Sequence, residues 1–319
     1  MLSILRTEND ELVPYSIEQE VPEGSWFSLV HPSADEMEQV SRVTHVEEHF
    51  LHAALDPEES SRMEMEDDYL FIIINVPKDR ASQEDDYDTL PVGIVVTPKY
   101  FITVCKENNN IIDKFAGGSF KFFNTSFKTR FLFMLLFRSA ILFLKDLRQI
   151  TRISDRVEDD LRKTMKNDNL FLLLDMQKGL TYYTIALKSN KVVVEKLLRM
   201  CTASLPNALI THYEEDGDLL EDVHIEYEQA MEMAQIQTDV LGGITDTFAS
   251  VISNNLNIVM KYLTSITIVL AVPTLLSGLF GMNVPVPYTN HPWGFAIVIG
   301  WSIVLTIGAV VWLWKKHLF

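Results

Sequence analysis

Two long runs without a charged side chain lie at the end of the chain and limit what it can fold into. Residues 262–280 (YLTSITIVLAVPTLLSGLF) and 293–314 (WGFAIVIGWSIVLTIGAVVWLW) contain no Asp, Glu, Lys or Arg. A bilayer core about 30 Å thick is crossed by a helix of roughly 20 residues, so each run is long enough to span it. Helices buried in a soluble core rarely stay uncharged over such a length. The region 262–319 is therefore predicted to form two transmembrane helices.

The basic residues beside these runs predict their orientation. Lys261 precedes the first run, Lys315 and Lys316 follow the second, and the connecting loop 281–292 has no Lys or Arg. Lys and Arg gather in the cytoplasmic loops of membrane proteins. We therefore expect a multi-pass protein of the cell membrane (inner or plasma membrane) with both termini in the cytoplasm. The first 25 residues are polar and acidic, unlike a signal peptide.

The remainder of the chain is strongly acidic. The 319 residues include 27 Lys or Arg and 44 Asp or Glu, which gives a formal net charge of −17. This balance excludes a nucleic-acid partner, because binding to phosphates requires a basic surface. The two cysteines, Cys105 and Cys201, are too few for a disulfide framework or a multi-cysteine metal site. His45 and His49 lie in a charged segment and are expected to face solvent rather than a metal.

The first 120 residues predict a cytosolic α/β domain within an α+β fold. Short runs of β-branched and aromatic residues, bounded by turn residues, are typical of strands. A further segment, 33–55, has apolar residues at helical spacing, and Gly117-Gly118 then interrupts the chain. The four expected strands are 26–30, 70–76, 92–97 and 100–105.

The middle region, 121–261, predicts long cytosolic helices and a stalk that continues into the membrane. No proline occurs between 125 and 203, which favours two long antiparallel helices with a turn near 166–169 (KNDN) and an end at Pro206. An acidic loop at 212–218 and one helix of about 60 residues, from 219 to 280, are expected next. The apolar run 131–144 is too short for a span and contains Arg138, so we interpret it as a buried helix face.

A repeat of small and polar residues follows one face of the long final helix. Steps of three and four residues are the spacing of helices wound around a common axis. Small residues also allow close packing of membrane helices, but we favour a water-filled lumen lined by hydroxyls and amides. Since two spans cannot enclose a pathway, a lumen requires a ring of subunits. The repeat comprises Asp239, Gly243, Asp246, Ser250, Ser253, Asn257, Met260, Thr264, Thr267, Ala271, Thr274, Gly278 and Gly281.

The tripeptide Gly281-Met282-Asn283 follows the first run and is separated from the final run by a short loop. With this motif in this position, the chain resembles the CorA-type magnesium transporters, and residues 253–283 are similar to the pore helix of that family. The resemblance implies a homopentameric funnel in the lipid bilayer, with 262–283 lining the pore and 293–314 outside it. It implies that divalent cations, mainly Mg²⁺ but also Co²⁺ or Ni²⁺, pass into the cytosol, with no enzyme activity and no organic cofactor.

The resemblance also implies roles for single residues. Gly281, Met282 and Asn283 would form the selectivity filter at the outer mouth, and Asn283 would be the residue nearest the metal. Other members of the repeat of small and polar residues, called the stripe below, would line the pore between this filter and the cytosol. Met260 and Leu263 would form an apolar gate. These pore-lining positions are Asp246, Asn257, Met260, Leu263, Thr264, Thr267, Ala271, Thr274 and Gly278.

A regulatory Mg²⁺ site between cytosolic domains is a further implication of the resemblance. Counting without gaps from the motif places one of its acids on Asp222. The second position falls on Ala53, which cannot bind a cation, so Asp56, or else Glu58 or Glu59, is the substitute we name. The loop 284–292 also lacks the acids that many members have. Two alternatives stay open: a Zn²⁺ transporter of the same architecture, and a membrane-tethered cytosolic sensor or scaffold.

Overall fold

The computed structural model describes residues 1–79, 87–120, 123–163, 167–202, 209–210, 214–287 and 292–316. Within this part of the chain the fold divides into two compact units, Met1–Ile244 and Thr245–Phe319. One helix, α6 (Glu214–Phe280), contributes to both units, because it continues past residue 244 without a break. The α+β class, with long helices and two apolar C-terminal helices, is as the sequence predicted.

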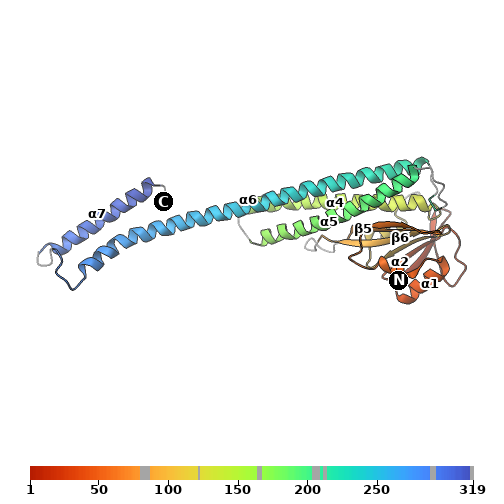
Figure 1. Ribbon diagram of the computed structural model, residues 1–319, viewed down its shortest axis with the longest axis horizontal. Helices are drawn as coiled ribbons and strands as arrows, with labels where there is room; N and C mark the ends of the chain where they lie inside the picture. Colours follow the sequence, from red (N-terminus) through yellow and green to blue (C-terminus); the bar gives the residue numbers. More distant parts are fainter. Residues whose placement is uncertain are drawn as a thin grey trace. The chain divides into compact units, whose positions relative to one another are not determined.

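A mixed sheet forms the N-terminal part of the first unit (Figure 1). Its strands are β1 (Leu2–Glu8), β2 (Glu11–Tyr15), β3 (Trp26–Val30), β4 (Arg62–Met65), β5 (Leu70–Pro77), β6 (Thr89–Val96) and β7 (Phe101–Cys105). They lie in the order β2-β1-β3-β7-β6-β5-β4. β3 pairs with β7 in parallel, and the other neighbours pair antiparallel.

The four predicted strands correspond to β3, β5, β6 and β7, but the prediction missed β1, β2 and β4. The missed strands carry many charged side chains and are only partly buried, so they lack the apolar pattern that marks a strand. β1 and β2 form a hairpin whose turn residues, Asn9 and Asp10, have φ angles of 49° and 67°. Asn and Asp tolerate this left-handed conformation better than most residues. The turn signal was therefore present in the sequence.

The segment 33–55 forms two helices, α1 (Ala34–Thr44) and α2 (Glu48–Ala53), rather than one. Ser33 and Glu36 form a capping box at the start of α1. His45 adopts a left-handed conformation, with φ 60°, which ends α1. A further short helix, α3 (Asn110–Ala116), was not predicted; the side chain of Asn109 caps it by accepting from the backbone N–H of Ile111.

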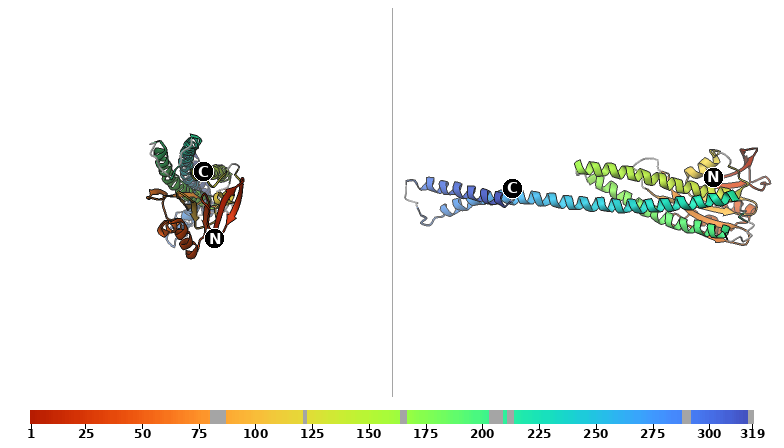
Figure 2. Two further views of the ribbon diagram at one scale, coloured as in Figure 1. Left: turned by 90° about the vertical axis from the view of Figure 1, so that its right-hand side faces the viewer. Right: turned by 90° about the horizontal axis from the view of Figure 1, so that it is seen from above.

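Helices cover both faces of the sheet, with α1 and α2 on one side and the long helices on the other (Figures 1 and 2). All eight residues of β5 are buried, as expected for a strand with packed layers on both faces. On the α1–α2 side, Val40, Phe50 and Phe71 belong to one apolar core. Gly93 in β6 allows a close approach there, because a Cβ atom on it would lie 2.4 Å from Cβ of Ala54.

The long helices α4 (Lys128–Lys163) and α5 (Asn167–Thr202) pack against the other face of the sheet. The apolar run 131–144 lies within α4, and most of its large side chains are buried, including Phe131, Leu136 and Phe143. This run is therefore a core face and not a membrane span, as predicted. The rings of Phe131 and Phe101 of β7 stack with their centroids 4.2 Å apart, which joins α4 to the sheet.

The predicted boundaries of the long helices differ from the observed ones. α6 begins at Glu214, so the prediction of an acidic loop was wrong over 214–218. Acidic residues are favourable at a helix N-terminus, because the helix dipole places positive charge there. The rest of that loop, Pro206 and Lys166 lie outside the described residues. The predicted turn at 166–169 was wrong over 167–169, because these residues already belong to α5. α5 begins at Asn167 and ends at Thr202.

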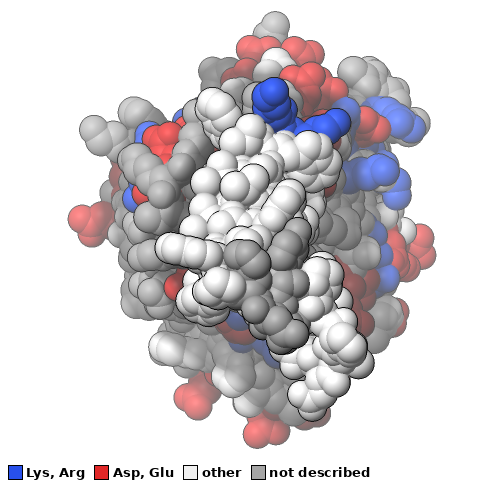
Figure 3. All heavy atoms as spheres, turned by 90° about the vertical axis from the view of Figure 1, so that its left-hand side faces the viewer, with Lys and Arg blue, Asp and Glu red and all other residues white. Residues whose placement is uncertain are grey.

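The second unit contains the C-terminal part of α6 and the helix α7 (Gly294–Lys315). Both helices are long and apolar enough to cross a membrane, and only 6% of the most apolar stretch of each is buried. A core helix of a soluble protein would be mostly buried, as α4 is. The surface therefore suits contact with lipid, and Figure 3 shows the broad uncharged area. Trp312 and Trp314 are exposed near the end of α7, where interfacial aromatic residues are common.

Candidate functional site

The stripe of small and polar residues forms an exposed face of α6. Its described positions, from Asp246 to Gly281, are all exposed to solvent in the single chain. Met260 and Leu263, the predicted gate, are each 57% exposed. The structure therefore places the predicted pore residues along one exposed face of a single helix. In the single chain they do not face one another across a pore. These exposed positions are Asp246, Asn257, Met260, Leu263, Thr264, Thr267, Ala271, Thr274 and Gly278.

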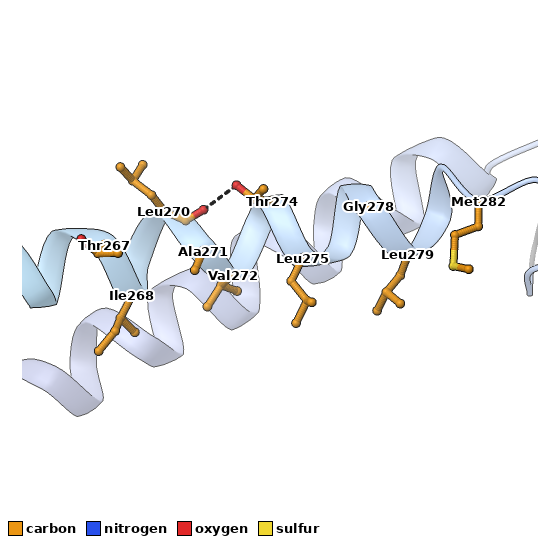
Figure 4. A pocket seen from close by; sticks show the side chains of 10 residues that line it. All are labelled: Thr267, Ile268, Leu270, Ala271, Val272, Thr274, Leu275, Gly278, Leu279 and Met282. Carbon is orange, nitrogen blue, oxygen red and sulfur yellow. Dashed lines mark hydrogen bonds between the residues drawn. The ribbon is translucent and has the colours of Figure 1, made fainter.

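The threonine hydroxyls of the stripe are oriented by their own helix. Oγ1 of Thr267 donates to the carbonyl oxygen of Leu263 at 2.8 Å. Oγ1 of Thr274 donates to that of Leu270, also at 2.8 Å (Figure 4). A hydroxyl has one hydrogen and two lone pairs, so this bond leaves the lone pairs free to accept. The exposed face of α6 thus presents acceptors, which suit the water molecules around a hydrated cation.

A groove with a volume of about 920 Å³ lies along the membrane half of α6 (Figure 4). Stripe residues Thr267, Ala271, Thr274 and Gly278 line it, together with a second, apolar set. Ile268 and Leu275, which are not part of the stripe, line the same groove. Each member of the apolar set directly follows a stripe residue in the sequence, so the set has the same spacing as the stripe. This second repeat could have been recognised from the sequence. Its members are Ile268, Val272, Leu275, Leu279 and Met282.

The end of α6 favours cations. The helix ends at Phe280, and the N–H of Gly281 donates to the carbonyl oxygen of Ser277 at 2.9 Å. The last carbonyls of a helix carry partial negative charge, and the last turn of α6 contains no basic residue to offset it. A Cβ atom on Gly281 would lie 3.0 Å from that same oxygen, so glycine fits closely here. Met282 and Asn283 follow, both exposed, and Asn283 adds an amide oxygen.

Charge is confined to the N-terminal end of the stripe. Asp246 is exposed, and the hydroxyl of Ser250, one turn further on, donates to its backbone carbonyl oxygen at 3.0 Å. Between residues 247 and 283 the sequence has one charged residue, Lys261. It follows Met260 directly and is not part of the stripe. The arrangement is therefore an acidic position followed by a neutral, oxygen-bearing face that ends at Asn283.

Comparison with known proteins decides the family. The family of CorA-like Mg²⁺ transporter proteins matches residues 23–316. The chain belongs to the CorA family. CorA proteins transport divalent cations across membranes and are not enzymes, so the stripe and its terminal motif belong to a transporter.

Individual CorA relatives match over most of the chain. The cobalt/magnesium transport protein CorA of Methanocaldococcus jannaschii is 26% identical over 294 residues, which are 88% of this chain and 86% of the relative. The complete structure of the CorA magnesium transporter from that organism matches with a TM-score of 0.82 at 23% identity, and covers 98% of this chain and 96% of that one. The cytoplasmic domain of ZntB from Vibrio parahaemolyticus matches with a TM-score of 0.51 at 13% identity, over 77% and 98% of the two chains. These structural matches show a shared fold.

The two candidate regulatory acids of this CorA protein lie on different elements of the first unit. Asp222 is exposed on α6. Asp56 is exposed after α2, and its Oδ1 accepts from the backbone N–H of Glu58 at 3.0 Å. Glu59 is already engaged, because its carboxylate lies 3.5 Å from Arg62. Among the described residues, no group of three His, Cys, Asp or Glu side chains is arranged to hold a metal.

The two histidines that sequence analysis considered do not share a helix. His45 follows the end of α1, and His49 lies in α2. Nδ1 of His49 lies 3.0 Å from the carboxylate of Glu47, and both side chains are well exposed. Their positions on either side of a helix break do not have the one-turn spacing that a pair of ligands on one helix needs.

Proposed function

We propose that this CorA protein is a homopentameric channel that carries Mg²⁺, and also Co²⁺ or Ni²⁺, into the cytosol. In this proposal, residues 1–120 and 121–261 are cytosolic, 262–283 line the pore and 293–314 form the outer helix. Both termini lie in the cytoplasm, in agreement with Lys261, Lys315 and Lys316 at the cytosolic ends of the spans. The ring of subunits supplies the enclosure that two spans per chain cannot provide.

The observation that carries the proposal is an exposed, neutral, oxygen-bearing face on a helix of membrane-spanning length, which ends in Gly281-Met282-Asn283. Mg²⁺ loses its bound water reluctantly. A ring of amide and hydroxyl oxygens that accept hydrogen bonds from these water molecules therefore suits it better than a site that coordinates the bare ion. Asn283 would select the hydrated ion at the outer mouth. Asp246 would concentrate cations at the cytosolic end of the pathway.

The membrane potential supplies the driving force for entry. A divalent ion gains roughly 4–5 kcal/mol per 100 mV of inside-negative potential, about twice the figure for a single charge. No nucleotide-hydrolysing motif is required for such transport, which agrees with the absence of a P-loop sequence in the chain.

Cytosolic Mg²⁺ would close the channel by binding between subunits. The acids of neighbouring cytosolic domains repel one another, and a cation bound near Asp222 of one subunit and Asp56 of the next would reduce that repulsion. Closer subunits would narrow the apolar gate at Met260 and Leu263. This coupling between a cytosolic site and the gate is feedback inhibition by the transported ion.

Two other functions predict different behaviour. A Zn²⁺ transporter would share the fold, which the ZntB domain also has, but Met282 in the middle of the motif favours Mg²⁺. A membrane-tethered sensor or scaffold would gain nothing from hydroxyls along one face of its span.

Ion flux into proteoliposomes tests the proposal. The full-length protein is reconstituted, and uptake of Mg²⁺, Co²⁺, Ni²⁺ and Zn²⁺ is compared at an inside-negative potential. We expect Mg²⁺ flux that exceeds Zn²⁺ flux and is lost in Asn283→Ala. Preferred Zn²⁺ flux would support the first alternative, and the absence of any flux would support the second.

A further inference from the structure

A second concave site lies in the first unit, between α4 and α6. Three residues of α4 and five of α6 line a groove with a volume of about 530 Å³, within the range of small-molecule sites. None of them belongs to the pore stripe or to the candidate regulatory acids. The groove therefore has no role in the function proposed above.

Two arginines form one wall of the groove. Arg148 and Arg152 are one turn apart on α4, so they lie on the same face of the helix. Both are exposed, and neither side chain makes an ion pair or hydrogen bond with the part of the chain that the structure describes. Arginines with no partner among the described residues are unexpected in a chain with 44 acids and 27 bases. Paired guanidinium groups match the geometry of a phosphate, which accepts two hydrogen bonds from each fork.

A buried amide on the facing helix lacks its hydrogen bond. Gln237 of α6 lines the groove and is only 8% exposed, and its Oε1 is shielded from water with no partner among the described residues. Buried acceptors in folded proteins are almost always bonded. A half-turn about the soft terminal torsion of glutamine exchanges Oε1 and Nε2, so this amide can offer either an acceptor or a donor to a bound molecule. A ligand with a hydrogen-bonding group besides its phosphate would match the amide of Gln237.

The remaining walls limit the size and charge of the ligand. Met233 and Ile236 provide apolar surface, and Ile236 is 58% exposed in the empty groove. A flexible thioether adapts to a flat ring. Glu232 also lines the groove, so its carboxylate opposes part of the positive charge of the two arginines. One phosphate on a neutral, partly apolar body matches this balance better than a polyphosphate does.

We propose that the groove between α4 and α6 binds a nucleoside monophosphate. Its phosphate lies on Arg148 and Arg152, its base lies over Met233 and Ile236, and a polar group of the base or sugar bonds to the side-chain amide of Gln237. The pore plays no part in this binding, so the proposal stands whichever cation the protein carries.

Calorimetric titration of the purified full-length protein in detergent tests the site, with AMP, CMP and inorganic phosphate as probes and EDTA present. We expect AMP to bind, and the double variant Arg148→Ala/Arg152→Ala to weaken binding at least about tenfold through the loss of charge-assisted bonds. Arg156→Ala is the matched control, because Arg156 is exposed one turn further along α4 and does not line the groove. It should change affinity less than about twofold. Gln237→Leu should weaken AMP and leave inorganic phosphate unchanged.

Several outcomes would overturn the proposal. They are the absence of binding by any nucleotide probe at millimolar concentration, equal binding of inorganic phosphate and AMP, and equal losses in the double variant and in Arg156→Ala. The competing occupant of the groove is a second copy of the chain. A photo-cross-linker attached to Met233→Cys, in a Cys201→Ser background, tests whether this copy lies in the groove. Cross-linking to a second copy without nucleotide would mean that another subunit fills the groove, and the nucleotide site would be rejected.

Discussion

Asn190 on α5 binds both backbone polar groups of Asn75 in the middle of β5. Its Oδ1 accepts from the N–H of Asn75 at 2.9 Å, and its Nδ2 donates to the carbonyl oxygen of Asn75 at 2.6 Å. The same amide reaches the hydroxyl of Tyr227 on α6 at 3.4 Å, and complete burial raises the pKa of that tyrosine. One side chain therefore links the sheet to α5 and to the N-terminal part of α6.

Replacement of Asn190 should destabilise the first unit. Asn190→Leu keeps the approximate volume but removes the side-chain donor to the carbonyl oxygen of Asn75, whereas the N–H of Asn75 keeps a bond to Oγ of Ser61 at 3.2 Å. A buried group left unpaired costs about 1–3 kcal/mol. We therefore expect a loss of about 1–3 kcal/mol in the free energy of unfolding, measured by denaturant titration of the full-length protein in detergent. Thr181→Ala is the control, because this exposed α5 hydroxyl bonds only to the carbonyl of Gln177. Equal stability of the two variants would show that the link contributes little.

Removal of the amide at the end of α6 should abolish transport. Asn283→Ala deletes one acceptor in every subunit of the proposed ring, so we expect Mg²⁺ uptake to fall to background while the oligomer stays assembled. Flux into proteoliposomes and size-exclusion chromatography measure the two properties. Val284→Ala, directly beside the motif, should retain uptake. Normal flux in Asn283→Ala would eliminate the selectivity role of this residue.

The position of a threonine relative to the stripe should decide its effect on flux. Thr274→Val removes a hydroxyl from the stripe, and Thr306→Val removes one from α7 that also bonds to its own helix, at 2.7 Å from the carbonyl oxygen of Ser302. We expect a loss of about tenfold in Mg²⁺ flux for the first, because a bond to a charged or polarised group contributes about 1.5–3 kcal/mol. The second should change flux less than about twofold. Similar losses in both would indicate that packing, not pore chemistry, explains the stripe.

Charge reversal at Asp222 should alter the response to cytosolic Mg²⁺. Asp222→Lys, or Glu221→Lys with Asp222→Lys, replaces a cation ligand with a cation, so a higher Mg²⁺ concentration should be needed to protect the cytosolic region from protease. Limited proteolysis of the full-length protein over a Mg²⁺ series measures the midpoint. Glu18→Lys, at an exposed position before β3, controls for net charge. An unchanged midpoint in the Asp222 variants would remove this residue from the sensor.

The membrane helices could be predicted because their signal is local. An uncharged run of 19 or 22 residues, and a stripe at heptad spacing, are properties of consecutive residues on one helix, so no distant contact is needed to recognise them. The position of Gly281-Met282-Asn283 after such a run was equally readable. The buried run in α4 was recognised for the same reason, because its length and Arg138 exclude a span.

The tertiary structure decided features that depend on residues far apart in the chain. β1, β2 and β4 form strands because they hydrogen-bond to neighbouring strands. Their mixture of polar and apolar side chains does not predict a strand. The partner of Asn75 is 115 residues away, and Gln237 lines the same groove as Arg148 and Arg152 only because α6 lies beside α4. Periodicity reports which side of a helix is apolar, whereas the partner of a buried polar group depends on how separate elements pack. That packing is a property of the whole fold, because each contact is stabilised by the others.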